Sequence, residues 1–467
     1  MNPATGAVLA GYPVNVTASP GVNLPASASN CHDKEWLAAD RFAGSPFQDQ
    51  LYVAWTQFTG SNCGFPTVVL AASSSDQGLT WSAASTLSTG AEGFVWPTHA
   101  AVAPNGDAYV SYHSHPGILP DGTSGQVFVL RSTDGGLSYP QKTLAYTPGN
   151  ADITFNIQTL PRELNQNQSW TQGSGQAWVV PDPSNSNVIS VVASDDPTNT
   201  AHGGANDDLA VYIVRSIDSG LNWGAPLQVD SGPANSHQFF PTAAIDPTSQ
   251  CLTVEWYDSR GGAANGTGNF LLDVFVRSSS NGGLTFGPEV KINDVAFDPD
   301  LGATDRFPTT GTLRIGEYIG VAVSNQLAHG VWTGNTATGQ QIMYDNATAC
   351  TPGDTDGDGC QDVDEQQTAV GSEGSGGRRD YLSPWDFYDT NGDKVIDLFI
   401  DIFTVAYAFG DDGDSLPPGE PDGYDTALDR SAPALAGDPW DMQAPDGLID
   451  LFTDVFGVAY QFGHDCT

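Results

Sequence analysis

The side chains best suited to chemistry in this sequence of 467 residues are acidic, and the densest group has the spacing of metal ligands. The twelve residues from Asp354 to Glu365 place acids at positions 1, 3, 5 and 9, glycine at 6, a main-chain carbonyl at 7 and glutamate at 12. Hard oxygen ligands in this pattern suit Ca²⁺, and without the ion the carboxylates would repel one another. A solvated acidic linker is the alternative. The expected ligands are Asp354, Asp356, Asp358, Cys360 through its carbonyl, Asp362 and Glu365.

A duplicated loop and helix follow this segment. Residues 384–386 (Pro-Trp-Asp) lead to VIDLFIDIFTVAYAFGDD at 395–412, and residues 439–441 (Pro-Trp-Asp) lead to LIDLFTDVFGVAYQFGHD at 448–465. Each apolar run predicts a helix. The second loop is two residues shorter before its helix, and whether it binds calcium stays open. In the first loop Asp401 is the candidate closing ligand, because the twelfth position is Ile400. The ligands expected there are Asp389, Asn391, Asp393, Val395 through its carbonyl, Asp397 and Asp401.

A third group of candidates lies at the ends of apolar, strand-like segments in the first 349 residues. Arginine can hold a carboxylate with two hydrogen bonds, paired acids can transfer protons, and aromatic rings can stack on sugars. Each type also has a structural alternative, since an aromatic ring at a strand end can pack between sheets and an acid can cap a loop. The candidate catalytic residues are Arg260, Asp258, Tyr257, Tyr318, Asp33 and Glu35.

These candidates can meet only if a repeated unit closes into a ring. Four turns share one signature, at residues 74–81, 132–139, 216–223 and 279–286, and each follows three apolar strands. We expect an Asp or Asn side chain to bond the turn backbone, glycine to supply a positive φ, and an aromatic ring to re-enter the core. Three strands, a turn and a fourth strand over about 50–60 residues are typical of a propeller blade. A fifth unit, 317–344, keeps the strands without the turn, and 1–30 is a candidate partial blade or ring-closing strand.

The four turns resemble the Asp-box (BNR) repeats of the sialidase superfamily, whose domains are six-bladed β-propellers, over roughly residues 30–345. The resemblance implies a mainly β protein with a six-bladed propeller, five blades being the alternative. It also implies a sialidase-like glycoside hydrolase, of exo-α-sialidase type, that acts on extracellular glycans or glycoproteins. The arginine element that precedes the family's first box is missing, because residues 306–308 (Arg-Phe-Pro) come too late. A non-catalytic, glycan- or protein-binding cell-surface propeller is therefore the alternative. In that family the boxes lie away from the active site, which implies structural roles for Asp76, Asp134, Asp218 and Asn281.

The acidic segment and its flanking cysteines resemble a thrombospondin type-3 calcium repeat with an EF-hand-like loop, and the duplicated loop and helix resemble a dockerin module. The second resemblance implies a small α-helical, calcium-binding region that anchors the protein to a cohesin-like or cell-surface partner. The alternative is that the two helices only pack on each other. The expected domains are an N-terminal segment (1–30), the propeller (31–349), a calcium loop (350–368), a linker (369–383) and the dockerin-like module (384–467).

Composition limits the partners further. The formal net charge is −40, and residues 350–467 hold −22 of it, from 26 acidic and 4 basic residues. This charge excludes binding to nucleic acid or to an anionic membrane surface. No apolar run reaches the roughly 18 residues of a membrane span, so we expect no membrane insertion. Six cysteines are compatible with disulfides whose pairing does not follow from the spacing. The expected location is extracellular or at the cell surface, although no signal peptide is visible.

Overall fold

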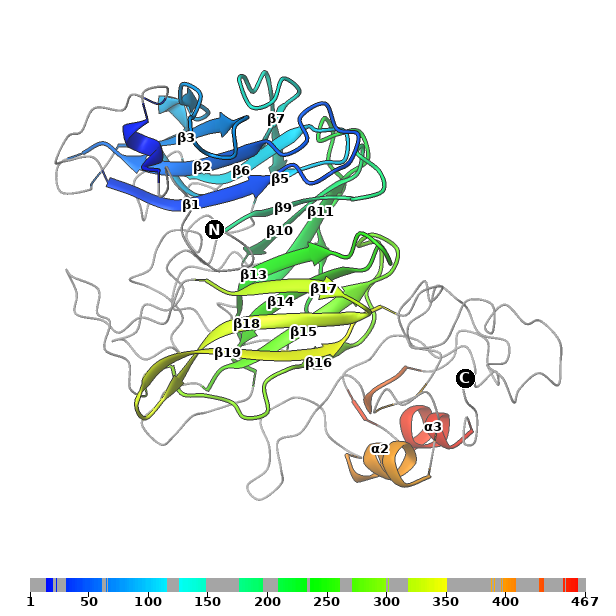
Figure 1. Ribbon diagram of the computed structural model, residues 1–467. Coiled ribbons are helices and arrows are strands. Elements are labelled where there is room, and N and C mark those ends of the chain that lie inside the picture. The colour runs from blue at the N-terminus through cyan, green and yellow to red at the C-terminus, as the bar shows by residue number, and fades with distance from the viewer. Residues whose placement is uncertain are drawn as a thin grey trace, which may run out of the picture.

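The computed structural model is mainly β, with five sheets up to residue 348 and two short helical segments near the C-terminus (Figure 1). It describes residues 14–19, 22, 31–60, 64, 66–115, 126–147, 176–195, 209–232, 236–260, 271–299, 301, 318–350, 388, 390, 396, 398–408, 428–431, 448–449 and 451–460. In these ranges no helix is both long enough and apolar enough to cross a membrane.

Each of the first four sheets is a four-stranded antiparallel meander, and the fifth sheet has three strands. The first sheet holds β1 (Cys31–Ala39), β2 (Leu51–Phe58), β3 (Thr67–Ser74) and β4 (Ser85–Thr86). The second holds β5 (Phe94–Val102), β6 (Ala108–His115), β7 (Gln126–Ser132) and β8 (Gln141–Tyr146). The third holds β9 (Trp178–Pro181), β10 (Ile189–Asp195), β11 (Ala210–Ser216) and β12 (Leu227–Gln228). The fourth holds β13 (Gln238–Ile245), β14 (Leu252–Asp258), β15 (Asp273–Ser279) and β16 (Glu289–Lys291), and the fifth holds β17 (Gly320–Ser324), β18 (Leu327–Thr336) and β19 (Gly339–Thr348).

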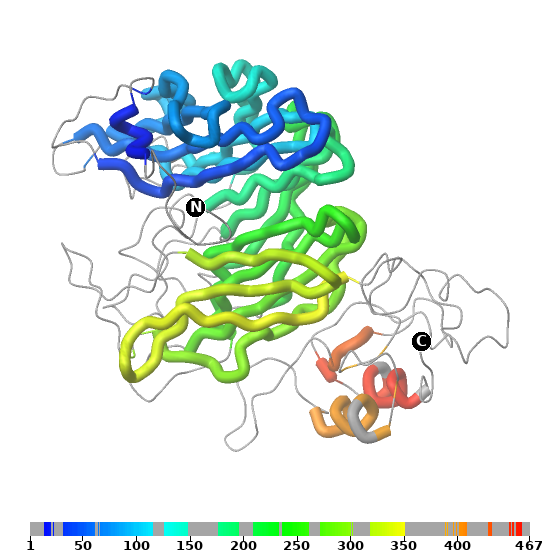
Figure 2. The backbone as a smooth tube through the Cα atoms, viewed as in Figure 1, coloured from blue at the N-terminus to red at the C-terminus, as the bar shows by residue number. Residues whose placement is uncertain are grey.

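The first strands of the five sheets lie side by side in chain order, β1 with β5, β5 with β9, β9 with β13 and β13 with β17. Figure 2 shows the same succession as a change from blue through green to yellow. This is the arrangement of propeller blades, with β1, β5, β9, β13 and β17 as inner strands. The expected unit is confirmed in the first four sheets, and among the described residues the fifth sheet has neither a fourth strand nor the turn. The described ranges contain no sixth sheet.

The four repeated turns have the bonding that their sequence predicts. In the first, the Ser74 hydroxyl donates to Asp76 Oδ1 at 2.8 Å and accepts from the Gly78 N–H at 2.8 Å, while Thr80 N–H donates to Asp76 Oδ1 at 2.8 Å. Gly78 has a φ of +85°, which an L side chain rarely adopts. The same three bonds recur in the turns that begin at Ser132, Ser216 and Ser279.

The described part of residues 1–30 forms a 3₁₀ turn, η1 (Val16–Ala18), and not a strand. Val14, Val16 and Val22 pack with Trp55 and the adjoining residues of β2 and β3. This segment therefore covers apolar side chains of the first sheet, which stabilises the free face of that sheet.

Inner strands also meet through aromatic rings. Trp36 of β1 lies 4.7 Å from the ring of His99 on β5 and 4.6 Å from the ring of Trp178 on β9. Burial lowers the pKa of His99 to about 3, so its ring is neutral and Nδ1 accepts the Val179 N–H at 3.2 Å. Three sheets are thus held together by one buried ring cluster.

A disulfide ties the fifth sheet to the fourth. Cys251, directly before β14, is fully buried and bonds to Cys350, two residues beyond β19, with 5.5 Å between their Cα atoms. Cys31 is also disulfide-bonded. A disulfide that closes a loop of 99 residues restricts the unfolded chain strongly.

The C-terminal part has its own small core. A π-helical turn, η4 (Leu398–Ile402), continues into α2 (Phe403–Tyr407), and a second one, η6 (Leu451–Val455), continues into α3 (Phe456–Tyr460). The two copies pack on each other (Figure 1). Their shared core consists of Tyr388, Ile396, Val405, Ala408, Leu428, Ile449 and Val458.

Candidate functional site

The candidate site lies where the inner strands β1 and β5 begin and where the chain enters β17. A β-bulge between Asp33 and Trp36 shifts the register of β1, and Lys34 within it has a φ of +50°. The bulge turns the Lys34 side chain into the protein, where it is fully buried. Its ammonium lies 4.5 Å from the centre of the Tyr318 ring and 5.4 Å from that of Trp96. A desolvated cation between two aromatic rings is held firmly, so the first two sheets and the segment that leads into the fifth meet at Lys34.

Hydrogen bonds around Lys34 fix its neighbours. Asp33 accepts the indole N–H of Trp96 at 3.0 Å and the Lys34 N–H at 2.9 Å. The hydroxyl of Thr98 donates to the Lys34 carbonyl at 2.6 Å. Asp33 is half-buried and Glu35 is exposed. Tyr318 remains 45% exposed, so part of its ring faces solvent. We call Asp33, Lys34, Glu35, Trp96 and Tyr318 the inner-strand cluster.

The bulge recurs on two other inner strands. The register of β5 shifts between Val95 and Thr98, and that of β13 shifts between Phe239 and Thr242. Phe240 in the β13 bulge has a φ of +52°, close to the value at Lys34. A β-bulge changes the direction of a side chain relative to the regular alternation of a strand, and bulges are common next to functional sites. Here the three bulges lie at the same end of three sheets, near the start of each inner strand.

The structure places the other three candidate residues in contacts between sheets. Tyr257 is fully buried, and its hydroxyl donates to the Thr333 carbonyl at 3.1 Å and accepts the Thr333 N–H at 2.9 Å. Asp258 is fully buried and accepts from Arg260 Nη2 at 2.7 Å, Arg260 Nε at 2.9 Å and the indole N–H of Trp256 at 3.1 Å. Tyr257 therefore joins the fourth and fifth sheets, and Asp258 holds Arg260.

Arg260 lies in a buried group of charges. Its Nη1 pairs with Glu289 at 2.5 Å, and its guanidinium stacks 4.3 Å from the centre of the Phe275 ring. Burial alone would lower the pKa of Arg260, but Asp258 and Glu289 beside it raise that pKa above the usual value. Burial, and then the charge of Glu289, raises the pKa of nearby Asp230 to about 7. Both carboxylates are thus paired with the guanidinium of Arg260 in this structure.

The six candidates thus separate into two groups. Asp33 and Tyr318 contact Lys34 and the exposed Glu35 follows it on β1, whereas Tyr257, Asp258 and Arg260 are built into sheet contacts. Sequence reasoning did not select Lys34 or Trp96. The signal was present in the register of the repeats, because Lys34 and Trp96 both come shortly before the residues of β1 and β5 that join the buried ring cluster.

Of the expected calcium ligands, only Asp401 is among the described residues; the others, at 354–365 and 389–397, lie outside them. Asp401 is fully buried, and its Oδ1 accepts the Thr390 N–H at 2.7 Å and the Thr390 hydroxyl at 2.9 Å. Asp454 has the equivalent place in the second copy, where its Oδ1 accepts the Arg430 N–H and the Tyr388 hydroxyl. Within the described ranges no three His, Cys, Asp or Glu side chains form a metal-binding group.

The hydrogen bonds of the two buried aspartates, Asp401 and Asp454, show which residues of the two copies correspond to each other. Thr390 follows Asp389, and Arg430 follows Asp429, so the start of the second loop corresponds to Asp429 and not to Asp441. Spacing in the sequence misses this because the second copy has thirteen additional residues between the corresponding positions: Asp429 and Asp454 are 25 apart, and Asp389 and Asp401 are 12 apart. Asp401 thus returns from its helix to the start of its loop, as a closing ligand must.

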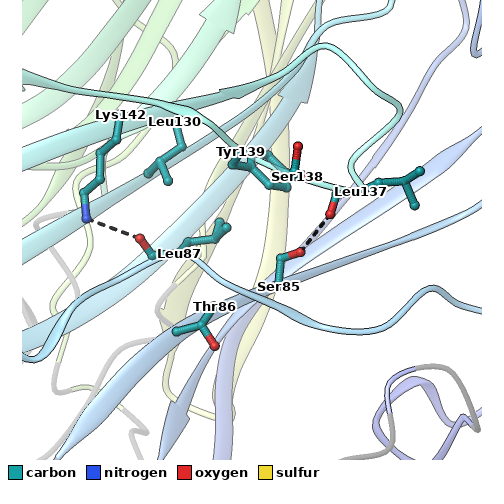
Figure 3. Close-up of a pocket in the computed structure, with 8 residues that line it drawn as sticks. All are labelled: Ser85, Thr86, Leu87, Leu130, Leu137, Ser138, Tyr139 and Lys142. Carbon is teal, nitrogen blue, oxygen red and sulfur yellow. Dashed lines mark hydrogen bonds between the residues drawn. The ribbon is translucent and has the colours of Figure 1, made fainter.

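A pocket of about 330 Å³ opens between the outer strands of the first and second sheets (Figure 3). Within it the Ser85 hydroxyl donates to the Leu137 carbonyl at 3.2 Å, and Lys142 Nζ donates to the Leu87 carbonyl at 3.2 Å. Lys142 also pairs with the buried Glu92. None of the candidate residues lines it; its lining consists of Ser85, Thr86, Leu87, Leu130, Leu137, Ser138, Tyr139 and Lys142.

Comparison with known proteins gives structural similarities only. No family model and no curated protein matches the sequence. An α-L-arabinofuranosidase of Fusarium graminearum in complex with arabinobiose is 12% identical over 68% of this chain and 92% of its own, with a TM-score of 0.41. A protein of unknown function from Dyadobacter fermentans is 14% identical over 69% and 96%, with a TM-score of 0.37. A levansucrase mutant of B. megaterium is 10% identical over 69% and 86%, with a TM-score of 0.35. At these values no functional residue can be transferred.

Proposed function

We propose that this protein binds extracellular glycans at the inner-strand cluster. The observation that carries the proposal is the meeting of Asp33, Lys34, Trp96 and Tyr318, which come from the first two sheets and from the segment that leads into the fifth. The exposed part of the Tyr318 ring offers a stacking surface, and the buried Lys34 behind it keeps the ring in place. A rigid ring beside hydrogen-bonding carboxylates is suited to a sugar, whose faces are apolar and whose edges carry hydroxyl groups.

The charges at the cluster favour a neutral glycan over a sialylated one. The exposed Glu35 and half-buried Asp33 can accept hydrogen bonds from sugar hydroxyls, but they repel a sugar carboxylate. The net charge of −40 adds repulsion over the whole surface. Arg260, the first candidate for holding a sialic acid carboxylate, is already paired with Asp258 and Glu289.

Glycoside hydrolysis is the second candidate function, favoured by two carboxyl groups, Asp33 and Glu35, at the cluster. A pair of carboxyl groups on either side of a glycosidic bond is the usual machinery of such enzymes. Release of product from aryl glycosides, including sialosides, tests this reading. The wild type is expected to be active and Glu35→Gln inactive if the second candidate is correct, and absence of turnover by the wild type excludes it for the substrates used.

Binding is tested with a panel of immobilised neutral polysaccharides and sialylated glycoproteins. Tyr318→Ala is expected to weaken retention on the bound glycan about threefold to tenfold, the range for loss of one stacking contact. Tyr344→Ala is the matched control, because Tyr344 is 57% exposed on the same sheet but lies on β19. Equal retention of the wild type and Tyr318→Ala would contradict the proposed site.

We infer further that the C-terminal module binds Ca²⁺ and anchors the propeller outside the cell. The disulfide Cys251–Cys350 supports an oxidising compartment. The buried Asp401 beside Thr390 fits a closing ligand for the loop that starts at Asp389. Hard carboxylate oxygens of this kind suit Ca²⁺, which would neutralise part of the −22 charge of residues 350–467.

A cohesin-like or cell-surface partner would bind the outward faces of the two helical segments. Phe403 is 52% exposed, its counterpart Phe456 is 42% exposed, and Phe452, whose ring lies 6.0 Å from that of Phe456, is 76% exposed. Since these rings belong to the two copies of a duplicated element, the module presents similar apolar groups twice. Retention of the full chain on cell-wall preparations, compared with that of Phe452→Ser, tests the anchoring function.

A further inference from the structure

Glu255 is an unusual side chain at the contact between the fourth and fifth sheets. It lies on β14, is fully buried, and neither of its carboxylate oxygens has a hydrogen-bond partner in the described part of the chain. Its cross-strand neighbour Thr242 on β13 is also fully buried, with a hydroxyl that has no partner there. A buried polar group without partners is costly, and such groups require an explanation.

The surroundings of Glu255 belong to both sheets. A Cβ added to Gly330 on β18 would stand 2.6 Å from Glu255 Oε1 and 2.4 Å from Ile292 Cδ1, so only glycine leaves room for the carboxyl group. Val276 on β15 is its other cross-strand neighbour. The fourth and fifth sheets lie side by side at this point (Figure 1), so the carboxyl group is enclosed by their shared apolar core.

In the part of the chain that the structure describes, no positive charge offsets the burial of Glu255. Thr242, Val276, Ile292 and Gly330 carry no charge, and burial is the cause of the pKa of Glu255 being raised well above its ordinary value of 4.5. The titratable groups on the elements packed against it are Tyr257, which is neutral because burial raises its pKa, the half-buried Asp345, which is cross-strand to Gly330, and Asp258, Asp273, Arg277, Glu289, Lys291, His329 and Tyr344. Neither cation is paired with Glu255, since Arg277 donates to the Gly287 and Val229 carbonyls and Lys291 lies 3.9 Å from Asp273.

We propose that Glu255 is a pH-sensitive latch that holds the fifth sheet against the fourth while the carboxyl group is protonated. Ionisation places an uncompensated charge in the apolar contact, and the contact can relieve it only by opening to water. Glu255 therefore stabilises the closed contact fully below pH 4.5, and this stabilisation is lost as the pH rises through the raised pKa of the folded protein.

The latch has a consequence for the inner-strand cluster. Tyr318 enters the fifth sheet two residues before β17, and its ring covers Lys34 on the first sheet. Opening of the contact between the fourth and fifth sheets would release Tyr318 from Lys34. Glycan binding would then weaken at high pH. This regulation rests on the proposed function, whereas the latch itself does not depend on glycan binding.

Hydrogen exchange of the full-length protein tests the latch without any ligand. Protection factors of the amides of β17, β18 and β19 are measured at pH 5, 6, 7 and 8 for the wild type and Glu255→Gln. Between pH 4.5 and the raised pKa the open form releases one more proton than the closed form, so protection in the wild type should fall about tenfold per pH unit. In Glu255→Gln it should stay constant, because the amide cannot ionise.

Asp294→Asn is the matched control, because it removes an exposed carboxylate from the segment that follows β16 and should keep the profile of the wild type. Glu255→Leu serves as a second neutral variant if the glutamine variant does not fold. A pH-independent protection of these strands in the wild type would overturn the latch, and so would the same fall in both neutral variants. If the wild type shows the pH-dependent fall in protection but binds no glycan measurably, the proposed function is overturned and the latch is not.

Discussion

Arg260 is expected to stabilise the propeller and not to contact a ligand, and replacing it tests this interpretation sharply. Arg260→Met leaves Asp258, which is fully buried, and Glu289, whose side chain is 5% exposed, without their shared cation. Removing one partner of a buried ion pair costs about 3–5 kcal/mol. Since Arg260 is itself only 18% exposed, solvent screens little of this loss. At ~2–3 °C per kcal/mol for a large domain, the melting temperature should fall by about 6–15 °C.

The assay combines thermal unfolding with glycan binding measured below the melting temperature. Arg41→Met is the control, because Arg41 is an exposed arginine and its loss should change the melting temperature little. Adding Asp258→Asn to Arg260→Met removes one of the stranded charges and should recover part of the loss. An unchanged melting temperature together with lost binding would show that Arg260 acts on the ligand, and the structural interpretation would be wrong.

Two further predictions concern pH and calcium. The pKa of Asp230 rises from 3.8 to about 7 on folding, through burial and then Glu289, so its stabilisation is present below about pH 3.8 and lost as the pH rises through 7. The unfolding free energy of the wild type relative to Asp230→Asn should therefore fall by up to about 4 kcal/mol between pH 4 and pH 8, measured by urea unfolding; a constant difference would refute the assignment. Removing calcium with EDTA should lower the unfolding temperature of the C-terminal module and spare that of the propeller, as seen by calorimetry, and Asp401→Asn should reduce this effect of EDTA; an identical trace with and without EDTA would exclude a calcium site.

The repeated sheets could be predicted because their information is local. Each turn closes on itself through bonds between residues two to four apart, such as Ser74 with Asp76 and Gly78. The strands that flank a turn are short apolar runs next to it. The sequence also shows that the last unit, 317–344, has no such turn, and the fifth sheet has three strands among the described residues.

The site could be predicted only in part, because the partners of its residues are distant in the sequence. Tyr257 is a plausible nucleophile from its type alone, but its hydroxyl is used by Thr333, 76 residues away. Arg260 is a plausible ligand group until Glu289, 29 residues away, is seen to pair with it. Lysine is rarely buried, so the residue type of Lys34 does not indicate that a bulge turns it inward between two rings; only its place in the register of the repeats points to it.

The second loop of the C-terminal module shows the same limit. Sequence spacing aligns it from Asp441, whereas the bond from the Arg430 N–H to the buried Asp454 aligns it from Asp429. An insertion increases the sequence separation of two residues that remain in contact in the structure, such as Arg430 and Asp454. Spacing in the sequence alone cannot detect such a contact.

The claim on which the account depends is that Lys34 and Tyr318 act together in binding a glycan. The most direct measurement is a double-mutant cycle on the dissociation constant of the retained polysaccharide, with Lys34→Met, Tyr318→Ala and both together. If the ammonium serves to hold the ring, each single variant should weaken binding by a similar factor, and the double variant should be no weaker than Tyr318→Ala within about 0.5 kcal/mol. Additive losses, or a dissociation constant unaffected by either substitution, would contradict the account.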